Sequence, residues 1–173
     1  KIGINIPMDR YQNRYENISY IANSLDTVFS SLSECFQFEL MVHSPEDIQI
    51  MKFLKSKIKI NILFGMPSHK VINEYERLYI AIGGRGHSQM IPFGLNIPII
   101  SLASHNKLLW FLESVKMKRF CIDINNEDLP TKILTNIKYI ENNYLDVKKR
   151  INFQSRRLLR NTQKNFTIIK KIL

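Results

Sequence analysis

The sequence lacks the features that mark membrane, secreted and zinc-stabilised proteins. No apolar run approaches the roughly 18–20 residues that a membrane-spanning helix needs. The first residues hold no long apolar stretch with a cleavage site, so we expect no signal peptide. The two cysteines, Cys35 and Cys121, lie far apart and outside any metal-ligand spacing. We therefore expect two buried thiols in a reducing compartment.

Nucleotide and metal signatures are also missing. The chain has no Gly-x-Gly-x-x-Gly motif and no phosphate loop ending in Lys-Ser or Lys-Thr, which argues against nicotinamide cofactors and nucleoside triphosphates. No histidine, cysteine and carboxylate residues share the spacing of metal ligands. We predict no metal ligand and no cofactor. The chain starts without methionine, directly in a strand-like run, which suggests a piece of a longer protein.

The positive charge is concentrated at one end of the chain. The 173 residues carry 25 lysines and arginines against 15 acids, a formal net charge of +10. Residues 146–173 contain nine of these cations and one acid, a net +8 that leaves +2 for residues 1–145. With 45% hydrophobic and 23% charged residues, the composition is that of a globular protein rather than a disordered or fibrous one.

Short apolar runs alternate with segments of helical periodicity through most of the chain. The predicted strands are residues 2–6, 38–42, 58–64, 79–82, 97–101 and 120–123, and helices begin near residues 13, 44, 68, 87, 108 and 128. Alternating strands and helices imply right-handed βαβ units and a parallel sheet. We therefore predict an α/β fold: a Rossmann-like, doubly wound parallel sheet with a C-terminal helix.

Three loops that follow predicted strands gather cationic and titratable side chains. In doubly wound sheets, ligands bind beyond the carboxyl ends of the strands, near the reversal of strand order. A strand order of 3-2-1-4-5-6 would make the loops after strands one, four and five neighbours. Those loops would then bring together Arg10, Arg85, His87, His105 and Lys107. Such a cluster suits a phosphate or a carboxylate.

The loop after the fourth predicted strand carries most of this hypothesis. Gly83 and Gly84 would let the backbone approach a ligand closely. The helix that begins near His87 would present free N–H groups to an anion, and Arg85 could bind it through two hydrogen bonds. Each residue also has a simpler interpretation: glycines that turn the chain, an arginine in a surface salt bridge, a histidine at a helix start, and solvated cations at Arg10 and Lys107.

The segment 81–95 holds Arg85-Gly86-His87 on the loop after a strand, then a helix of small and apolar residues. A Pro-led strand and a loop ending in Lys107 follow it. These features resemble the polysaccharide pyruvyl transferase family, and the resemblance covers roughly residues 1–125. The chain departs from many members of that family at Gly86, where they have a bulky residue, and at residues 105–106, where they have tyrosine.

The resemblance implies a GT-B architecture, in which two Rossmann-like domains face a cleft. Members transfer pyruvate from phosphoenolpyruvate to a sugar of a cell-surface polysaccharide and form a ketal. This chain would be the C-terminal, donor-binding domain, and a missing N-terminal domain would complete the cleft. The implied partners are phosphoenolpyruvate as donor substrate and a sugar or lipid-linked saccharide as acceptor, in a cytoplasmic enzyme of cell-envelope synthesis.

The same resemblance suggests roles for individual residues. We predict His87 as the catalytic acid and base that delivers a proton to the methylene carbon, and Arg85 as the group that holds the anionic donor. The predicted substrate-binding residues are Arg10, Gly83, Gly84, Ser88, Ser104, His105 and Lys107. Two alternatives stay open: a GT-B glycosyltransferase that uses a nucleotide-sugar, and a non-catalytic basic binding module.

We divide the chain into a Rossmann-like donor-binding domain, residues 1–145, and a basic amphipathic helix, residues 146–173. The apolar stripe of this helix begins just before it and comprises Tyr144, Val147, Ile151, Leu158, Phe166 and Ile169, interrupted by Gln154 and Thr162. The helix either packs on the domain or reaches back to the missing domain, or it attaches to an anionic membrane at the inner face. Nucleic acid is the least favoured partner, because the basic stretch has no recognition motif and little aromatic interleaving.

Overall fold

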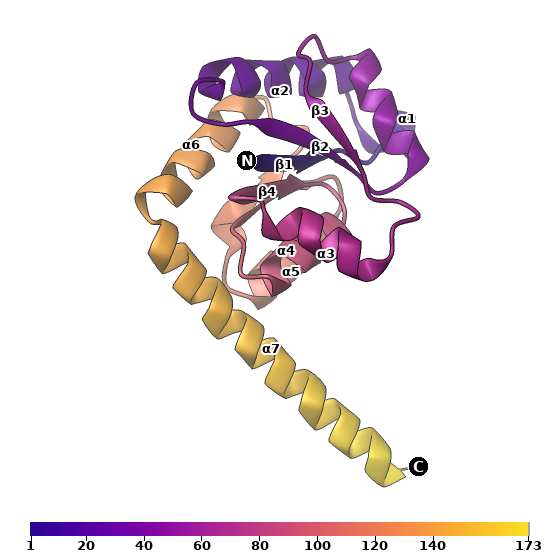
Figure 1. Cartoon of the computed structure of the whole chain (residues 1–173), viewed down its shortest axis with the longest axis vertical. Helices are drawn as coiled ribbons and strands as arrows, with labels where there is room; N and C mark the ends of the chain where they lie inside the picture. Colours follow the sequence, from indigo (N-terminus) through magenta and orange to yellow (C-terminus); the bar gives the residue numbers. More distant parts are fainter. Residues whose placement is uncertain (173) are drawn as a thin grey trace.

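The computed structural model describes residues 1–172, with side chains described through Lys170. The predicted charge at Lys171 and the last residue of the predicted tail, Leu173, lie outside the described side chains. Six parallel strands form one sheet in the order β3-β2-β1-β4-β5-β6, which confirms the predicted fold class (Figure 1). This is the strand order under which the loops after strands one, four and five become neighbours. The strands are β1 (Ile2–Asn5), β2 (Phe38–Val42), β3 (Lys59–Ile62), β4 (Ile80–Gly83), β5 (Ile99–Ala103) and β6 (Cys121–Asp123).

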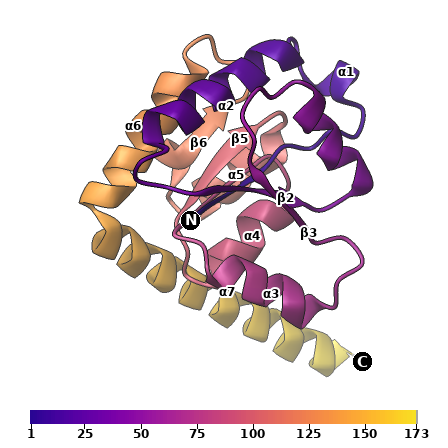
Figure 2. The ribbon, with the colours of Figure 1, turned by 45° about the horizontal axis from the view of Figure 1, so that its top comes forward.

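Helices cover both faces of the sheet. They are α1 (Tyr11–Arg14), α2 (Ile18–Leu32), the 3-10 helix η1 (Pro45–Lys52), α3 (Ser68–Glu76), α4 (His87–Gly94), α5 (Asn106–Ser114), the 3-10 helix η2 (Lys118–Phe120), α6 (Leu129–Asn142) and α7 (Tyr144–Ile172). In both ribbon views α2 and α6 lie side by side over one face, while α3 and α4 lie over the other (Figures 1 and 2). Every residue of β1, β2 and β4 is buried, as expected for a sheet covered on both faces.

Two local predictions need correction. The helix expected to begin near Asn13 begins at Ile18, because the side chain of Asn17 accepts a hydrogen bond from the Tyr20 N–H at 3.0 Å and caps it.

The two cysteines were expected to be buried, yet Cys35 is exposed and Cys121 is half-buried; both are free thiols. Cys35 lies in the turn after α2, where the chain leaves the core.

The long helix α7 belongs to the domain only along its first half. Val147 and Ile151 are buried in the core, and the ring of Tyr144 stacks on that of Tyr79 with centroids 4.3 Å apart. Beyond Leu158 the helix continues away from the domain (Figure 1). Of the predicted apolar stripe, Phe166 and Ile169 are thus exposed. The division at residue 145 stays a prediction. No helix in the described part of the chain is both long and apolar enough to span a bilayer.

Candidate functional site

The centre of the carboxyl edge of the sheet brings four loops together. β1 pairs with β2 on one side and β4 on the other, and Asn5 is in register with Gly83. The loops after β1 and β4 therefore leave the sheet side by side. This is the point where strand order reverses and where doubly wound folds bind ligands.

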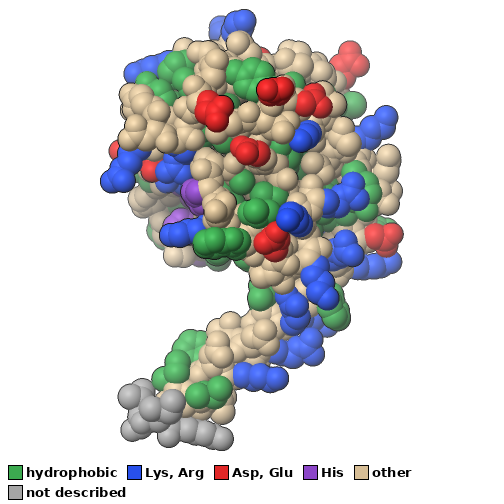
Figure 3. Space-filling model, turned by 180° about the vertical axis from the view of Figure 1, so that it is seen from behind, with side chains coloured by type: hydrophobic (Ala, Val, Ile, Leu, Met, Phe, Trp, Pro, Cys, Tyr) green, Lys and Arg blue, Asp and Glu red, His purple; other side chains and the backbone are tan. Residues whose placement is uncertain are grey.

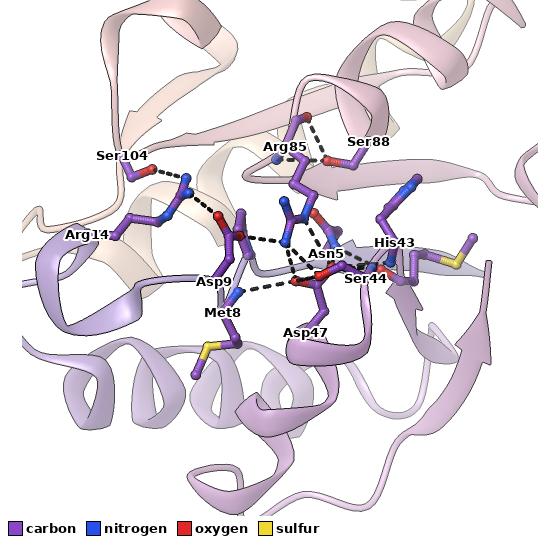
Figure 4. A network of polar contacts seen from close by, with 12 residues as sticks. Asn5, Met8, Asp9, Arg14, His43, Ser44, Asp47, Arg85, Ser88 and Ser104 are labelled. Atoms are coloured by element: carbon purple, nitrogen blue, oxygen red, sulfur yellow. Dashed lines mark hydrogen bonds and ion pairs between the residues drawn. The ribbon is translucent and has the colours of Figure 1, made fainter. Parts of the chain in front are cut away.

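Arg85, on the loop after β4, is held between two carboxylates (Figure 4). Its Nη2 donates to Asp47 Oδ1 at 2.7 Å and to Asp9 Oδ1 at 2.6 Å, and its Nε donates to Asp47 Oδ2 at 3.2 Å. Nη2 also lies 3.0 Å from the hydroxyl of Ser44. The guanidinium is thus fixed in one orientation by groups from two other loops.

Asp47 is the fully buried centre of this arrangement. Besides Arg85, its carboxylate accepts hydrogen bonds from the backbone N–H of Met8 and His43, each at 3.2 Å, and from Asn5 Nδ2 at 3.0 Å. Burial alone would raise the pKa of Asp47, but the hydrogen bond and charge of Arg85, with help from Met8 and Asn5, hold the pKa below its usual value. The carboxylate stays ionised and links the ends of β1, β2 and β4.

Asp9 extends the network to the far side of the site. Its Oδ2 accepts from Arg14 Nη2 at 2.8 Å, and Arg14 Nη1 donates to the hydroxyl of Ser104, after β5, at 3.4 Å (Figure 4). The Nε of Arg14 is buried and has no hydrogen-bond partner among the described residues. A buried donor without an acceptor is costly, so this part of the site holds a polar group whose hydrogen bonding is incomplete.

A hollow of about 260 Å³ opens beside this network. It is lined by Arg14, Gly84, Arg85, Gly86, His87, Met90 and His105. A second hollow of about 360 Å³ adjoins it and is lined by Ala103, Ser104, His105, Asn106, Leu109, Cys121, Asp123 and Asn125. His105 lines both hollows, so they lie next to each other near the carboxyl ends of β4, β5 and β6.

A larger hollow, of about 650 Å³, lies at the opposite, amino edge of the sheet. Its buried acid, Glu39, is already paired with Lys1 at 2.9 Å and Arg77 at 2.6 Å. We place the candidate site at the carboxyl edge, because doubly wound sheets bind ligands beyond the carboxyl ends of their strands.

A second histidine lies behind the site. The ring of His43, at the end of β2, stacks near that of His87 with centroids 6.1 Å apart, and its Nε2 lies 2.6 Å from the hydroxyl of Tyr75. Burial lowers the pKa of His43 to about 4. His87 and Arg85 lower it further, and the charge of Asp47 acts in the opposite direction. His43 is therefore uncharged at neutral pH.

The structure brings some of the predicted site residues together and leaves others apart. Arg85, His87, His105 and Gly84 line one hollow, and Ser104 lies beside it. The other predicted cations, Arg10 and Lys107, are exposed and line neither hollow.

Gly83, Gly84 and Ser88 serve contacts inside the protein. A Cβ at Gly83 would overlap Ser88 Oγ, and one at Gly84 would lie 2.6 Å from Pro7 Cδ. The hydroxyl of Ser88 accepts from the Arg85 N–H at 3.1 Å and donates to the Arg85 carbonyl at 2.8 Å. These residues shape the loop that carries Arg85, whereas Gly86 faces open space.

Sequence reasoning missed Asp9, Asp47, Arg14 and His43. The segment 44–47 has the pattern of a helix start. The structure confirms that local role, because Asp47 accepts a hydrogen bond from the Ser44 N–H at 3.3 Å. The strand order considered in the sequence analysis also places the loop after strand two next to strand one. That order was the available signal that His43 and Asp47 belong to the site.

Comparisons with known proteins establish the fold alone. No protein-family model and no curated protein matches the chain. A similar solved structure is that of a putative UDP-N-acetylglucosamine 2-epimerase from Listeria monocytogenes, with a TM-score of 0.56 and 16% identity. The match covers 96% of this chain and 45% of that one, so this chain spans less than half the length of its structural neighbour. The similarity shows a Rossmann-like α/β fold that matches a neighbour of the GT-B type.

Proposed function

We propose that this chain is the donor-binding domain of a sugar-modifying transferase of the GT-B type, with phosphoenolpyruvate as the donor and pyruvyl transfer as the reaction. The observation that supports this most is the hollow in which Arg14, Arg85, His87 and His105 meet at the strand-order reversal. Two guanidinium groups and two imidazoles suit a small donor that carries two anionic groups.

The two arginines would have different tasks. Arg85 is already bound by Asp9 and Asp47, so its position is fixed before a donor arrives. Preorganised charge of this kind stabilises a developing anion without a reorganisation cost. Arg14 still has a buried Nε without an acceptor among the described residues, and a phosphate or carboxylate oxygen would satisfy it. Arg14 is therefore added to the proposed donor-binding residues.

In the proposed reaction, His87 as an imidazolium gives its proton to the methylene carbon of phosphoenolpyruvate, which becomes a methyl group. An acceptor hydroxyl forms a bond to the adjacent carbon, the bond from that carbon to the phosphate oxygen breaks, and a second hydroxyl closes the ketal. The two hydroxyls release two protons, of which one restores His87 and the other leaves with phosphate. His87 is exposed on the hollow, where an acceptor can reach it.

A nucleotide-sugar is the second candidate donor. The similarity to a putative UDP-N-acetylglucosamine 2-epimerase favours it, because that protein shares the fold over nearly the whole chain. A diphosphate would occupy the same edge of the sheet, near the N-terminus of α4. Both candidates make the chain a donor-binding domain, but they differ in the ligand that it holds.

Titration calorimetry on the 173-residue chain separates these donors. We expect phosphoenolpyruvate to bind at least about tenfold more tightly than inorganic phosphate, since a second anionic group adds charge-assisted hydrogen bonds. Tighter binding of UDP-N-acetylglucosamine would replace the proposed donor with the second candidate. Binding of neither compound would refute the assignment of a donor site to this edge.

A further inference from the structure

The last part of α7 is a surface without a function in the proposed reaction. Arg157 makes the last hydrogen bond from this helix to the domain, to the carbonyl of Ser114, within the described part of the chain. Every residue from 159 to 170 is exposed. The helix nevertheless continues through this segment and points away from the folded body (Figure 1).

This exposed end of α7, residues 159–170, is amphipathic. Leu159, Phe166 and Ile169 are 58%, 61% and 50% exposed, and their spacing of seven and three residues places them on one side of the helix. Ile168, which is 56% exposed, lies apart from them, on the side of Arg160 and Lys164. Arg160 and Lys164 are four residues apart and lie on the opposite side. Figure 3 shows the same division, with lysine and arginine side chains along one side of α7 and hydrophobic side chains on the other toward its end.

The charge of the same segment is entirely positive. Residues 159–170 contain three cations, Arg160, Lys164 and Lys170, and no acid. Five more cations precede them on α7, where the only acid, Asp146, is paired with Lys149 at 3.3 Å. Lys170 follows Phe166 by four residues and so lies beside it on the helix, where it can reach a charged surface that the apolar side touches.

We propose that the exposed end of α7 binds the surface of an anionic lipid bilayer. Leu159, Phe166 and Ile169 enter the boundary between headgroups and acyl chains, and the cations bind anionic headgroups. A bilayer is the partner that uses both properties of the segment. A nucleic acid would pair with the cations and leave the apolar side in water, and a second copy would bring two acid-free segments together. This inference does not depend on the identity of the donor.

Vesicle flotation with the 173-residue chain tests the proposal. We expect at least about tenfold more binding to vesicles of phosphatidylcholine with phosphatidylglycerol than to phosphatidylcholine alone, and weaker binding as salt increases. Equal binding to the two lipids, or no binding to either, would overturn the proposal. So would binding to duplex DNA, or self-association of the chain in analytical ultracentrifugation, without binding to the anionic vesicles.

A matched pair of variants locates the contact. Phe166→Ser should lower vesicle binding about tenfold or more, because it removes one large apolar side chain from the membrane-facing side. Phe153→Ser changes an equally exposed phenylalanine, at 63%, that lies on the other side of α7 and before the exposed end. It should leave binding unchanged. Equal effects of the two substitutions would contradict the assigned surface. Both sites are exposed, so an unchanged melting temperature verifies that each variant is folded.

Discussion

Nη2 of Arg85 lies 2.7 Å from Oδ1 of Asp47, a residue 38 positions away that is fully buried. Asp47 belongs to the helix start after β2 and Arg85 to the loop after β4, so the pair joins segments on either side of β1. A buried carboxylate that loses its cation leaves an uncompensated charge, which makes such a pair costly to break. The ion pair therefore connects the stability of the domain to the geometry of the candidate site.

Asp47→Asn should destabilise the domain by about 3–5 kcal/mol. The substitution keeps the size of the side chain but removes its charge, and its amide nitrogen cannot accept the hydrogen bonds that the lost oxygen accepted. Asp9→Asn is the control, since Asp9 contacts the same guanidinium but is 38% exposed, and it should cost about 1 kcal/mol or less. Urea unfolding measures both. Similar losses for the two variants would show that burial of Asp47 does not set the strength of the pair.

Acid should destabilise the domain in a window set by His43. The pKa of this histidine falls from 6.5 to about 4 on folding, so the unfolded chain binds a proton that the folded domain refuses. The contribution is fully present above about pH 6.5 and is lost as pH falls toward 4. Asp47, whose pKa is also lowered, adds a separate loss below its ordinary value of 3.8.

His43→Gln tests this assignment. Unfolding free energy measured from pH 7 to pH 4 should fall less steeply in the variant than in the parent chain, by a difference on the order of 1–2 kcal/mol across the window. Below about pH 3.8 the two curves should run parallel, because Asp47 is present in both. A parallel course from pH 7 to 4 would show that another group accounts for the acid sensitivity.

Two glycines on the loop that carries Arg85 should respond oppositely to alanine. At Gly83 a Cβ would overlap Ser88 Oγ and lie 2.6 Å from Ser88 Cβ, so Gly83→Ala should cost about 1–3 kcal/mol as α4 is displaced. Gly86 has a helical φ of −57°, and a Cβ there would meet no atom within 4 Å, so Gly86→Ala should be neutral or stabilise by up to about 1 kcal/mol. Thermal unfolding compares the two variants. A loss at Gly86 equal to that at Gly83 would contradict this difference in packing.

Arg14 and Arg10 form a matched pair for donor binding. Arg14 lines the hollow and has an unsatisfied buried Nε, so Arg14→Ala should weaken phosphoenolpyruvate binding about ten- to a hundredfold, the worth of a charge-assisted hydrogen bond. Arg10 is exposed and lines neither hollow, so Arg10→Ala should leave affinity unchanged. Calorimetry on the two variants decides between them. If only Arg10→Ala lowered the affinity for phosphoenolpyruvate, the donor would bind at Arg10, as the sequence predicted, and not at Arg14.

Local sequence patterns predicted the fold well, because each strand is a short apolar run that can be recognised without knowing its neighbours. The apolar runs of β1 and β4 are buried along their whole length and that of β5 along all but its last residue, so their sequence alone identifies them as strands. Their alternation with helices predicts a parallel sheet. The ends of elements were less accurate. The helix expected near Asn13 begins five residues later, because Asn17 rather than Asn13 caps it.

The site was only half predictable, because its contacts join distant segments. Asp47 has the spacing of a capping residue, and that local role is real, but its bond to Arg85 crosses the sheet and leaves no trace in spacing. Gly83 shows the same limit. A glycine at a strand end signals a close approach, and only the folded structure shows that Ser88 is what approaches. Residues that contact one another across a sheet are found once the topology is known.

The first half of α7 contains a polar residue that the fold does not need. Gln154 is 4% exposed on the side of the helix that packs on the domain, and its Oε1 has no hydrogen-bond partner among the described residues. Replacing an unsatisfied buried group with an apolar one of similar size removes its desolvation cost, so Gln154→Leu should stabilise the domain by about 0.5–1.5 kcal/mol. Gln163→Leu, on the exposed end of the same helix, should change stability by less than about 0.5 kcal/mol. Urea unfolding measures both variants. Destabilisation by Gln154→Leu would show that Oε1 accepts a hydrogen bond in solution, and that the contact between α7 and the domain includes a polar group beside Val147 and Ile151.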